Sequence, residues 1–222
     1  QEVDYVLEKM NDELNRGFAR RGYQVLGWTE LGFIYLMSTI PIDEVADLRG
    51  KKVWTTANSP MANAVFVRAQ VSPVTISAPD VLVALQTRLV EVVYNSPYYA
   101  LITQWYTRTQ YLIDLPLAYI GSGLIMSNRA FSRLPAELQA ITKRVSAKHL
   151  LRVTAKTRQD NEDALNLMFK RGVQKITVEP VQVEQFKQLL DQAVNDINPK
   201  HLSRDYLRKV REALGEFQTL QK

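Results

Sequence analysis

The longest helical pattern of the sequence lies in its second half. Residues 134–172 read LPAELQAITKRVSAKHLLRVTAKTRQDNEDALNLMFKRG. Apolar residues recur there three and four positions apart, a proline stands at the start and a glycine at the end, as is typical of an amphipathic helix. At ~1.5 Å of rise per residue, such a helix is longer than a small domain is wide. We therefore predict a helix over residues 135–172 that packs against two lobes.

Short β-prone segments alternate with helical ones along the rest of the chain. Strands are predicted at residues 23–28, 52–55, 74–76, 89–93, 111–113, 123–126 and 175–178. Helices are predicted at residues 3–18, 61–69, 81–85, 186–197 and 203–218. This alternation is typical of an α/β fold with a mostly parallel sheet, in which ligands bind beyond the carboxyl ends of the strands.

Two of these helices have sequence signals at their starts. Ser59 followed by Pro60 combines a capping residue with a first-turn proline. Ser77, with Asp80 three residues later, resembles a capping box before the helix at 81–85.

Composition excludes several classes of protein. The chain has 222 residues, of which 46% are hydrophobic, which suits one large domain or two small lobes. Its apolar runs are far shorter than the ~18 residues that cross a bilayer. Cysteine is absent, which excludes disulfides and thiolate sites. The 28 basic and 23 acidic residues leave a small excess that is spread thinly, so we expect no nucleic-acid partner.

The residues that enzymes need are scarce. His149 and His201 are the two histidines, and neither has the spacing of a metal or catalytic motif. The turn-like Gly121-Ser122-Gly123 matches no nucleotide-binding loop, and the carboxylates form no catalytic pair by spacing. We therefore predict no catalytic residues, no metal site and no cofactor.

Aromatic and polar residues are concentrated between Tyr94 and Tyr119. Tyrosine offers rigid apolar surface with a polar tip, and asparagine offers a donor and an acceptor, which suits binding of a small molecule. Tyr94 and Asn95 stand where a strand ends, so we expect them to contact a ligand. Trp105 and Tyr106 have helical spacing, and packing is the favoured interpretation for them.

Five phrases in order along the chain resemble one family. They are YQVLGW at 23–28, DLRGKKVW at 47–54, ALQT at 84–87, YNSP at 94–97 and LPAELQ at 134–139. Together they resemble the solute-binding proteins of tripartite ATP-independent periplasmic (TRAP) transporters. The resemblance implies two α/β lobes with a helix spanning both, which close on a small solute, commonly an organic acid, and deliver it to a membrane permease.

The resemblance also implies a domain organisation. Residues 1–28 and 119–159 would form the first lobe with the spanning helix, and residues 29–118 and 160–222 the second. The first lobe would be incomplete, because family members carry a further N-terminal βα segment. A periplasmic location is implied, with the signal peptide outside the given chain.

The family's two clamp arginines, which grip a carboxylate, are replaced by Ile34 and Trp54, while its asparagine is matched by Asn95 and its acidic residue is replaced by Tyr94. The solute then either lacks a carboxylate or is held through another cation or a metal ion. A buried core position is the alternative for Trp54. The expected ligand-binding residues are Trp54, Asn95, Tyr94, Phe33, Ser77 and Tyr119.

The leading hypothesis is thus a periplasmic receptor for a small organic solute that acts with TRAP permease subunits, as a monomer or dimer. A ligand-sensing two-lobed protein without a transporter is the alternative. An enzyme on the same fold is a third class, disfavoured by the missing motifs.

Overall fold

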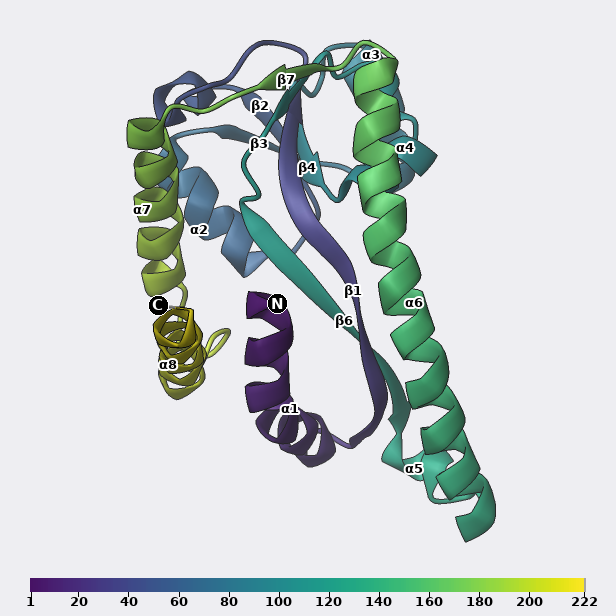
Figure 1. Cartoon of the computed structure of the whole chain (residues 1–222). Coiled ribbons are helices and arrows are strands. Elements are labelled where there is room, and N and C mark those ends of the chain that lie inside the picture. Colours follow the sequence, from purple (N-terminus) through teal and green to yellow (C-terminus); the bar gives the residue numbers. More distant parts are fainter. Residues whose placement is uncertain (222) are drawn as a thin grey trace. The chain divides into compact units, whose positions relative to one another are not determined.

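The computed structural model describes residues 1–221, and these form two compact units (Figure 1). Unit 1 comprises residues 1–29, 122–153 and the chain from Asn198 onward, and unit 2 comprises residues 30–121 and 154–197. The division cuts two strands and the long helix. It also places the C-terminal helix in unit 1, whereas the sequence assigned it to the second lobe.

Unit 1 is built from helices around two strand segments. It holds α1 (Glu2–Arg20), the start of β1 (Tyr23–Ser38), the end of β6 (Ala118–Ser127), α5 (Asn128–Phe131), the start of α6 (Ala136–Lys170) and α8 (Arg204–Leu220). Strand β6 pairs with β1. Helix α8 packs on α1, where the rings of Tyr5 and Phe217 are 5.6 Å apart.

Unit 2 contains a mixed sheet. Its further strands are β2 (Lys52–Thr55), β3 (Ser72–Thr75), β4 (Val92–Asn95), β5 (Tyr111–Ile113) and β7 (Gln174–Ile176), in the order β3-β2-β4-β1-β5-β7. Strand β2 is parallel to β3 and β4, and β5 is parallel to β7. The central strand β1 is antiparallel to β4 and β5. Strands β3, β2, β4, β5 and β7 therefore run in one direction, as expected of a mostly parallel sheet, and β1 runs against them. Alternation of strands and helices does not reveal the direction of a strand inserted between two crossover units.

Helices cover both faces of this sheet. Helices α2 (Pro60–Ala69) and α7 (Pro180–Asp196) pack on each other over one face. The other face is covered by α3 (Val81–Gln86), α4 (Pro97–Ile102) and the end of α6. Successive strand residues therefore enter different cores: Val53 packs toward α2 and Trp54 toward α3 and Trp105.

Most of the predicted elements are present, and the ends of several differ from the prediction. Strand β1 continues to Ser38, beyond the predicted end at residue 28, and Gly121 and Gly123 lie within β6 and not in a turn. The single turn Ala78–Asp80 precedes α3, and the Ser77 hydroxyl donates a hydrogen bond to the Asp80 carboxylate. The predicted capping box is wrong, because Ser77 caps no backbone N–H of α3. Further single turns lie at Val45–Leu48 and Trp105–Thr107.

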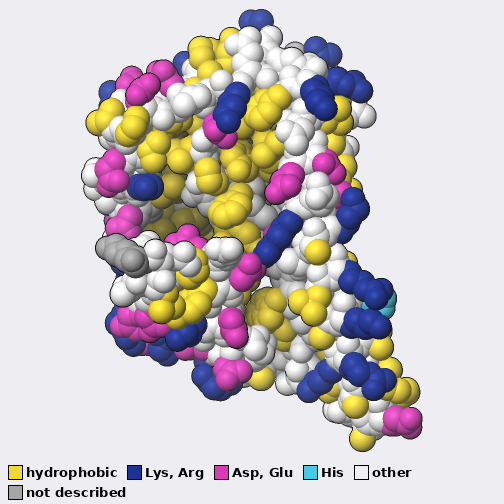
Figure 2. All heavy atoms as spheres, in the orientation of Figure 1, with side chains coloured by type: hydrophobic (Ala, Val, Ile, Leu, Met, Phe, Trp, Pro, Cys, Tyr) yellow, Lys and Arg dark blue, Asp and Glu magenta, His cyan; other side chains and the backbone are white. Residues whose placement is uncertain are grey.

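Charges are unevenly distributed on the face drawn in Figure 2. Acidic and basic side chains are interspersed over much of it, and basic side chains gather along α6. Exposed residues of the first half of that helix include Lys143, Arg144, Lys148 and Arg152. The positive excess is therefore less thinly spread than expected.

Candidate functional site

A buried carboxylate lies at the start of the unit 2 part of β1. The Glu30 side chain is only 3% exposed, and it faces the guanidinium of Arg158 on α6. Arg158 donates from Nε to Oε1 at 3.0 Å and from Nη2 to Oε2 at 2.8 Å. This two-pronged geometry is the strong form of a carboxylate–guanidinium pair, and it compensates for the water that Glu30 has lost.

Tyr119 of β6 joins the same carboxylate. Its hydroxyl donates a hydrogen bond to Oε2 of Glu30. Burial raises the pKa of Tyr119, the bond to Glu30 raises it further, and Arg158 opposes the rise. The Tyr119 phenol therefore stays protonated, and its O–H donates to Glu30.

The exposed side chain of Phe33 packs against Tyr119. The rings of Phe33 and Tyr119 meet edge to face with centroids 5.2 Å apart, and Phe33 is 45% exposed. These two residues belong to the predicted ligand-binding set, and the structure brings them into contact. They form an apolar surface with one hydroxyl oxygen at its side, a combination suited to a small organic molecule.

Asn161, one turn beyond Arg158 on α6, holds the backbone beside this surface. Its Nδ2 donates to the Leu31 carbonyl at 2.9 Å, and its Oδ1 accepts from the backbone N–H of Tyr98 at 3.0 Å. Gly32 has φ +95°, and a Cβ there would lie 2.8 Å from Nδ2 of Asn161. The amide thus links β1 to the first turn of α4, and the close approach requires glycine at 32.

Trp54 lies in the hydrophobic core of unit 2. It is 4% exposed, and its indole N–H donates to the Ile76 carbonyl at 3.1 Å. Its ring packs 5.0 Å from that of Trp105 and 5.6 Å from that of Tyr94. The alternative of a core position describes this environment, and solute contact by Trp54 stays a prediction.

Tyr94 and Asn95 follow one another at the end of β4. Tyr94 is half-buried, its hydroxyl lies 3.4 Å from that of Thr55, and burial raises its pKa. Asn95 is also half-buried, and its Oδ1 accepts from the Ser96 backbone N–H at 2.8 Å. Asn95 pairs with Tyr35 of β1 in the sheet, so its position is fixed two residues from Phe33 along that strand.

Sequence reasoning missed Glu30, Arg158 and Asn161. Glu30 carries one available signal, because it is a lone carboxylate inside the apolar run that forms β1. Within residues 1–221, no group of three or more His, Asp or Glu side chains could hold a metal ion. The same part of the chain contains no helix with both the length and the apolar character needed to span a bilayer.

Comparison with known proteins shows which family the chain belongs to. The family model described as "Bacterial extracellular solute-binding protein, family 7" matches residues 2–200. A search of curated protein sequences gives no match.

Solved structures have the same fold. An extracytoplasmic solute receptor of Bordetella pertussis that binds pyroglutamic acid is 19% identical, with a TM-score of 0.85 over 96% of this chain and 69% of that one. The sugar acid binding protein of Advenella mimigardefordensis, in complex with galactonate, is also 19% identical, with a TM-score of 0.87 over 97% and 69% of the two chains. A TRAP periplasmic solute-binding protein of Desulfovibrio salexigens with bound orotic acid is 18% identical, with a TM-score of 0.85 over 97% and 70%. The predicted fold class and family are confirmed: this chain belongs to family 7 of the bacterial extracellular solute-binding proteins.

Proposed function

We propose that this protein is a periplasmic receptor that captures a small organic acid and delivers it to a TRAP-type membrane permease. The observation that carries the proposal is the family match over residues 2–200. It is supported by the pyroglutamic acid, orotic acid and galactonate bound by proteins of the same fold. In this role the protein binds and releases its solute unchanged and catalyses no reaction.

The aromatic and polar side chains of unit 2 would supply the solute contacts. Phe33 offers an exposed ring and Tyr119 a hydroxyl oxygen, while Asn95 and Tyr94 offer polar groups at the end of β4. Ser77 is exposed beyond β3. Trp54 would act from the core, by holding the ring of Tyr94 in place.

Capture by closure of two lobes is part of the proposal. Strands β1 and β6 and helix α6 each pass from one compact unit to the other, so three chain segments are available as hinges. A solute that favours the closed state by its differential affinity would shift the population toward closure. Small-angle X-ray scattering should then show a smaller radius of gyration when solute is added.

Binding can be tested by screening carboxylates, amino acids, sugars and divalent metals for thermal stabilisation, followed by calorimetric titration. A bound solute raises the apparent stability by mass action, by about 2.7 kcal/mol at one hundred times Kd. We expect stabilisation by at least one organic acid and its loss in Phe33→Ala, with Tyr23→Ala of unit 1 as the control. Stabilisation by none of these compounds would refute solute capture.

Delivery needs a separate test in cells. Uptake of the identified acid should require both this receptor and the permease subunits. If uptake proceeds normally without the receptor while a signalling response is lost, the ligand-sensing alternative replaces the transport role.

A further inference from the structure

The contacts of Glu30 with Arg158 and Tyr119 fix the direction of the hydrogen bond between Tyr119 and Glu30. A phenol has one proton to donate and two lone pairs that accept. Glu30 accepts from Tyr119, and its carboxylate also takes the two N–H groups of Arg158 at 2.8 and 3.0 Å. A carboxylate in this arrangement has nothing to donate back, so the proton of Tyr119 is the one in the Tyr119–Glu30 bond.

The hydrogen bond from Tyr119 to Glu30 is costly to break. The Glu30 side chain is 3% exposed, so water does not replace Tyr119 at low cost if the phenol turns away. The raised pKa of Tyr119 is in keeping with a retained proton. What Tyr119 can offer to any further molecule is therefore its oxygen lone pairs alone.

The two charges next to Tyr119, those of Glu30 and Arg158, cancel. The positive charge of Arg158 is balanced by Glu30, so the pair has no net charge. An ionised carboxylate placed at the Tyr119 oxygen would meet an acceptor, with the Glu30 carboxylate behind it. The two positions at which the family resemblance expects cationic clamps are apolar here, as Ile34 and Trp54, both buried.

We propose that Glu30 holds Tyr119 as a hydrogen-bond acceptor only, so that the receptor selects solutes that present a hydroxyl or amine donor to the Phe33–Tyr119 surface. This inference rests on the proposed function and specifies the chemistry of its solute. The aliphatic part of such a solute lies against Phe33, and its donor group points at the Tyr119 oxygen. A carboxylate, where the solute has one, is held away from this surface.

Matched compounds isolate the donor. Butanoate, 4-hydroxybutanoate and 4-aminobutanoate form one trio, and hexanoate, 6-hydroxyhexanoate and 6-aminohexanoate form a second trio of greater length. Each compound is titrated into the full chain by calorimetry. We expect the hydroxyl or the amino member to bind more tightly than the unsubstituted acid by roughly 2- to 12-fold, the range that one net hydrogen bond supports. The two substituted members distinguish a neutral donor from a cationic one.

Variants connect the preference to the residues. Tyr119→Phe removes the acceptor but keeps the ring against Phe33, so the difference in affinity between the donor-bearing and the unsubstituted acids should disappear. Tyr23→Phe removes the hydroxyl of an exposed tyrosine of unit 1 and should leave the preference intact. Glu30→Gln replaces the charged acceptor, so ultraviolet titration of tyrosinate, taken as the difference from the Tyr119→Phe background, should show Tyr119 ionising at lower pH.

The outcomes separate this inference from the proposed function. Equal binding within both trios, or a preference for donors that persists in Tyr119→Phe, overturns the acceptor role of Tyr119. Neither result contradicts the proposed receptor function. An unchanged tyrosinate titration in Glu30→Gln overturns the role of Glu30. Failure of all six compounds also overturns the inference, whereas the receptor itself falls only if the wider screen of organic acids fails too.

Discussion

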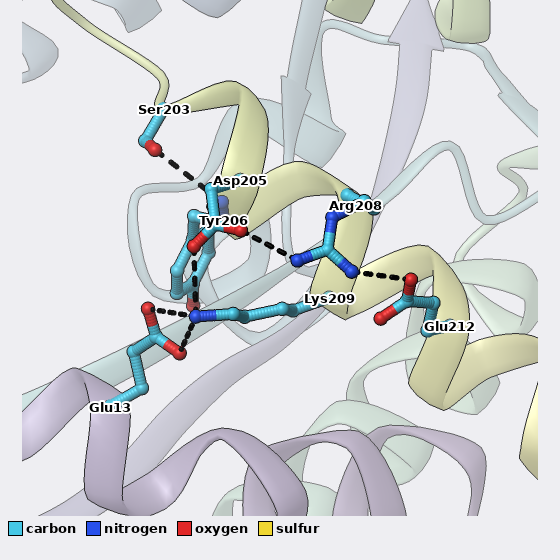
Figure 3. Close-up of polar contacts among 7 residues, drawn as sticks. All are labelled: Glu13, Ser203, Asp205, Tyr206, Arg208, Lys209 and Glu212. Carbon is cyan, nitrogen blue, oxygen red and sulfur yellow. Dashed lines mark hydrogen bonds and ion pairs between the residues drawn. The ribbon is translucent and has the colours of Figure 1, made fainter.

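Two charged networks of this protein use the same chemistry in different surroundings. In unit 2, Arg158 and Glu30 form a pair whose carboxylate is almost removed from water. In unit 1, Lys209 of α8 bridges Glu13 of α1 and Asp205, at 2.8 Å each (Figure 3). The carboxylates of this second network retain more of their exposure, at 26% and 56%.

The α8 network continues along its own helix. Arg208 donates to Asp205 and to Glu212, each at 2.6 Å, with the three- and four-residue spacing of helix neighbours. Solvated pairs of this kind are screened by salt and contribute little to stability. Exposure thus decides the role of each network: the pair at Glu30 can fix the position of Tyr119, whereas the pairs on α8 add weakly to the packing of α1 on α8.

The largest expected effect comes from breaking the ion pair between the buried Glu30 carboxylate and Arg158. In Arg158→Met, the Glu30 carboxylate, 3% exposed, keeps its hydrogen bond from Tyr119 but loses the guanidinium that balances its charge. We expect the free energy of unfolding, measured by chemical denaturation, to fall by about 3 kcal/mol. Lys209→Met, the matched change on α8, should cost much less, and equal losses in the two variants would remove the distinction between the networks.

Replacing both partners tests whether the unpaired charge causes this loss of stability. Glu30→Leu combined with Arg158→Met removes the charge together with its compensation, and should recover much of the stability lost in Arg158→Met alone. A double variant as unstable as the single one would show that packing, and not the unpaired charge, causes the loss.

The next effect concerns the backbone that Asn161 holds beside Glu30. Gly32→Ala places a methyl group 2.8 Å from Nδ2 of Asn161 at φ +95°, so it adds displacement of the amide to backbone strain. We expect a loss of about 2 kcal/mol in unfolding free energy. Gly22→Ala is the control in unit 1, because φ is +87° there with no atom within 4 Å, and it should cost about half as much.

The contrast between the networks also explains what the sequence could predict. Helix α6 follows from periodicity, since apolar spacing is a local property, and it was predicted to within a few residues. The α8 network is also local, because residues three and four apart on a helix are neighbours. Glu30 and Arg158 are 128 positions apart, and no spacing rule connects them.

Two features of the fold were hidden for physical reasons. Both faces of the sheet are covered by helices, so an apolar strand such as β2 does not reveal which face Trp54 occupies. Strand β1 continues through Gly27 and Gly32, residues that usually weaken a strand. Here a Cβ at Gly27 would lie 2.6 Å from Leu150, and one at Gly32 would meet Asn161, so close approach of α6 accounts for both glycines.

A smaller effect appears at alkaline pH. The pKa of Tyr119 is raised in the folded protein, so the folded state retains a proton that the unfolded chain releases above about pH 10. The contribution of Tyr119 to the free energy of unfolding is therefore complete below pH 10, and it is lost as pH rises toward the pKa of Tyr119 in the folded protein. Wild type should lose unfolding free energy more steeply than Tyr119→Phe above pH 10, by up to about 1.4 kcal/mol per pH unit. Parallel curves for the two proteins would contradict the raised pKa.

The smallest effect lies at acid pH in the α1–α8 contact. Hydrogen bonds from Lys209 and Arg208 lower the pKa of Asp205, and those from Lys9 and Tyr5 lower the pKa of Glu216. The folded state thus releases these protons more readily than the unfolded chain, so the contribution is present above the ordinary carboxyl pKa values of 3.8 and 4.5 and is lost as pH falls below them. Denaturation of wild type should therefore depend on acid pH more steeply than that of Asp205→Asn/Glu216→Gln. Because these groups are solvated, molar salt should bring the two curves together. A difference that persists in molar salt would show that this network is shielded from solvent, as the Glu30 carboxylate is.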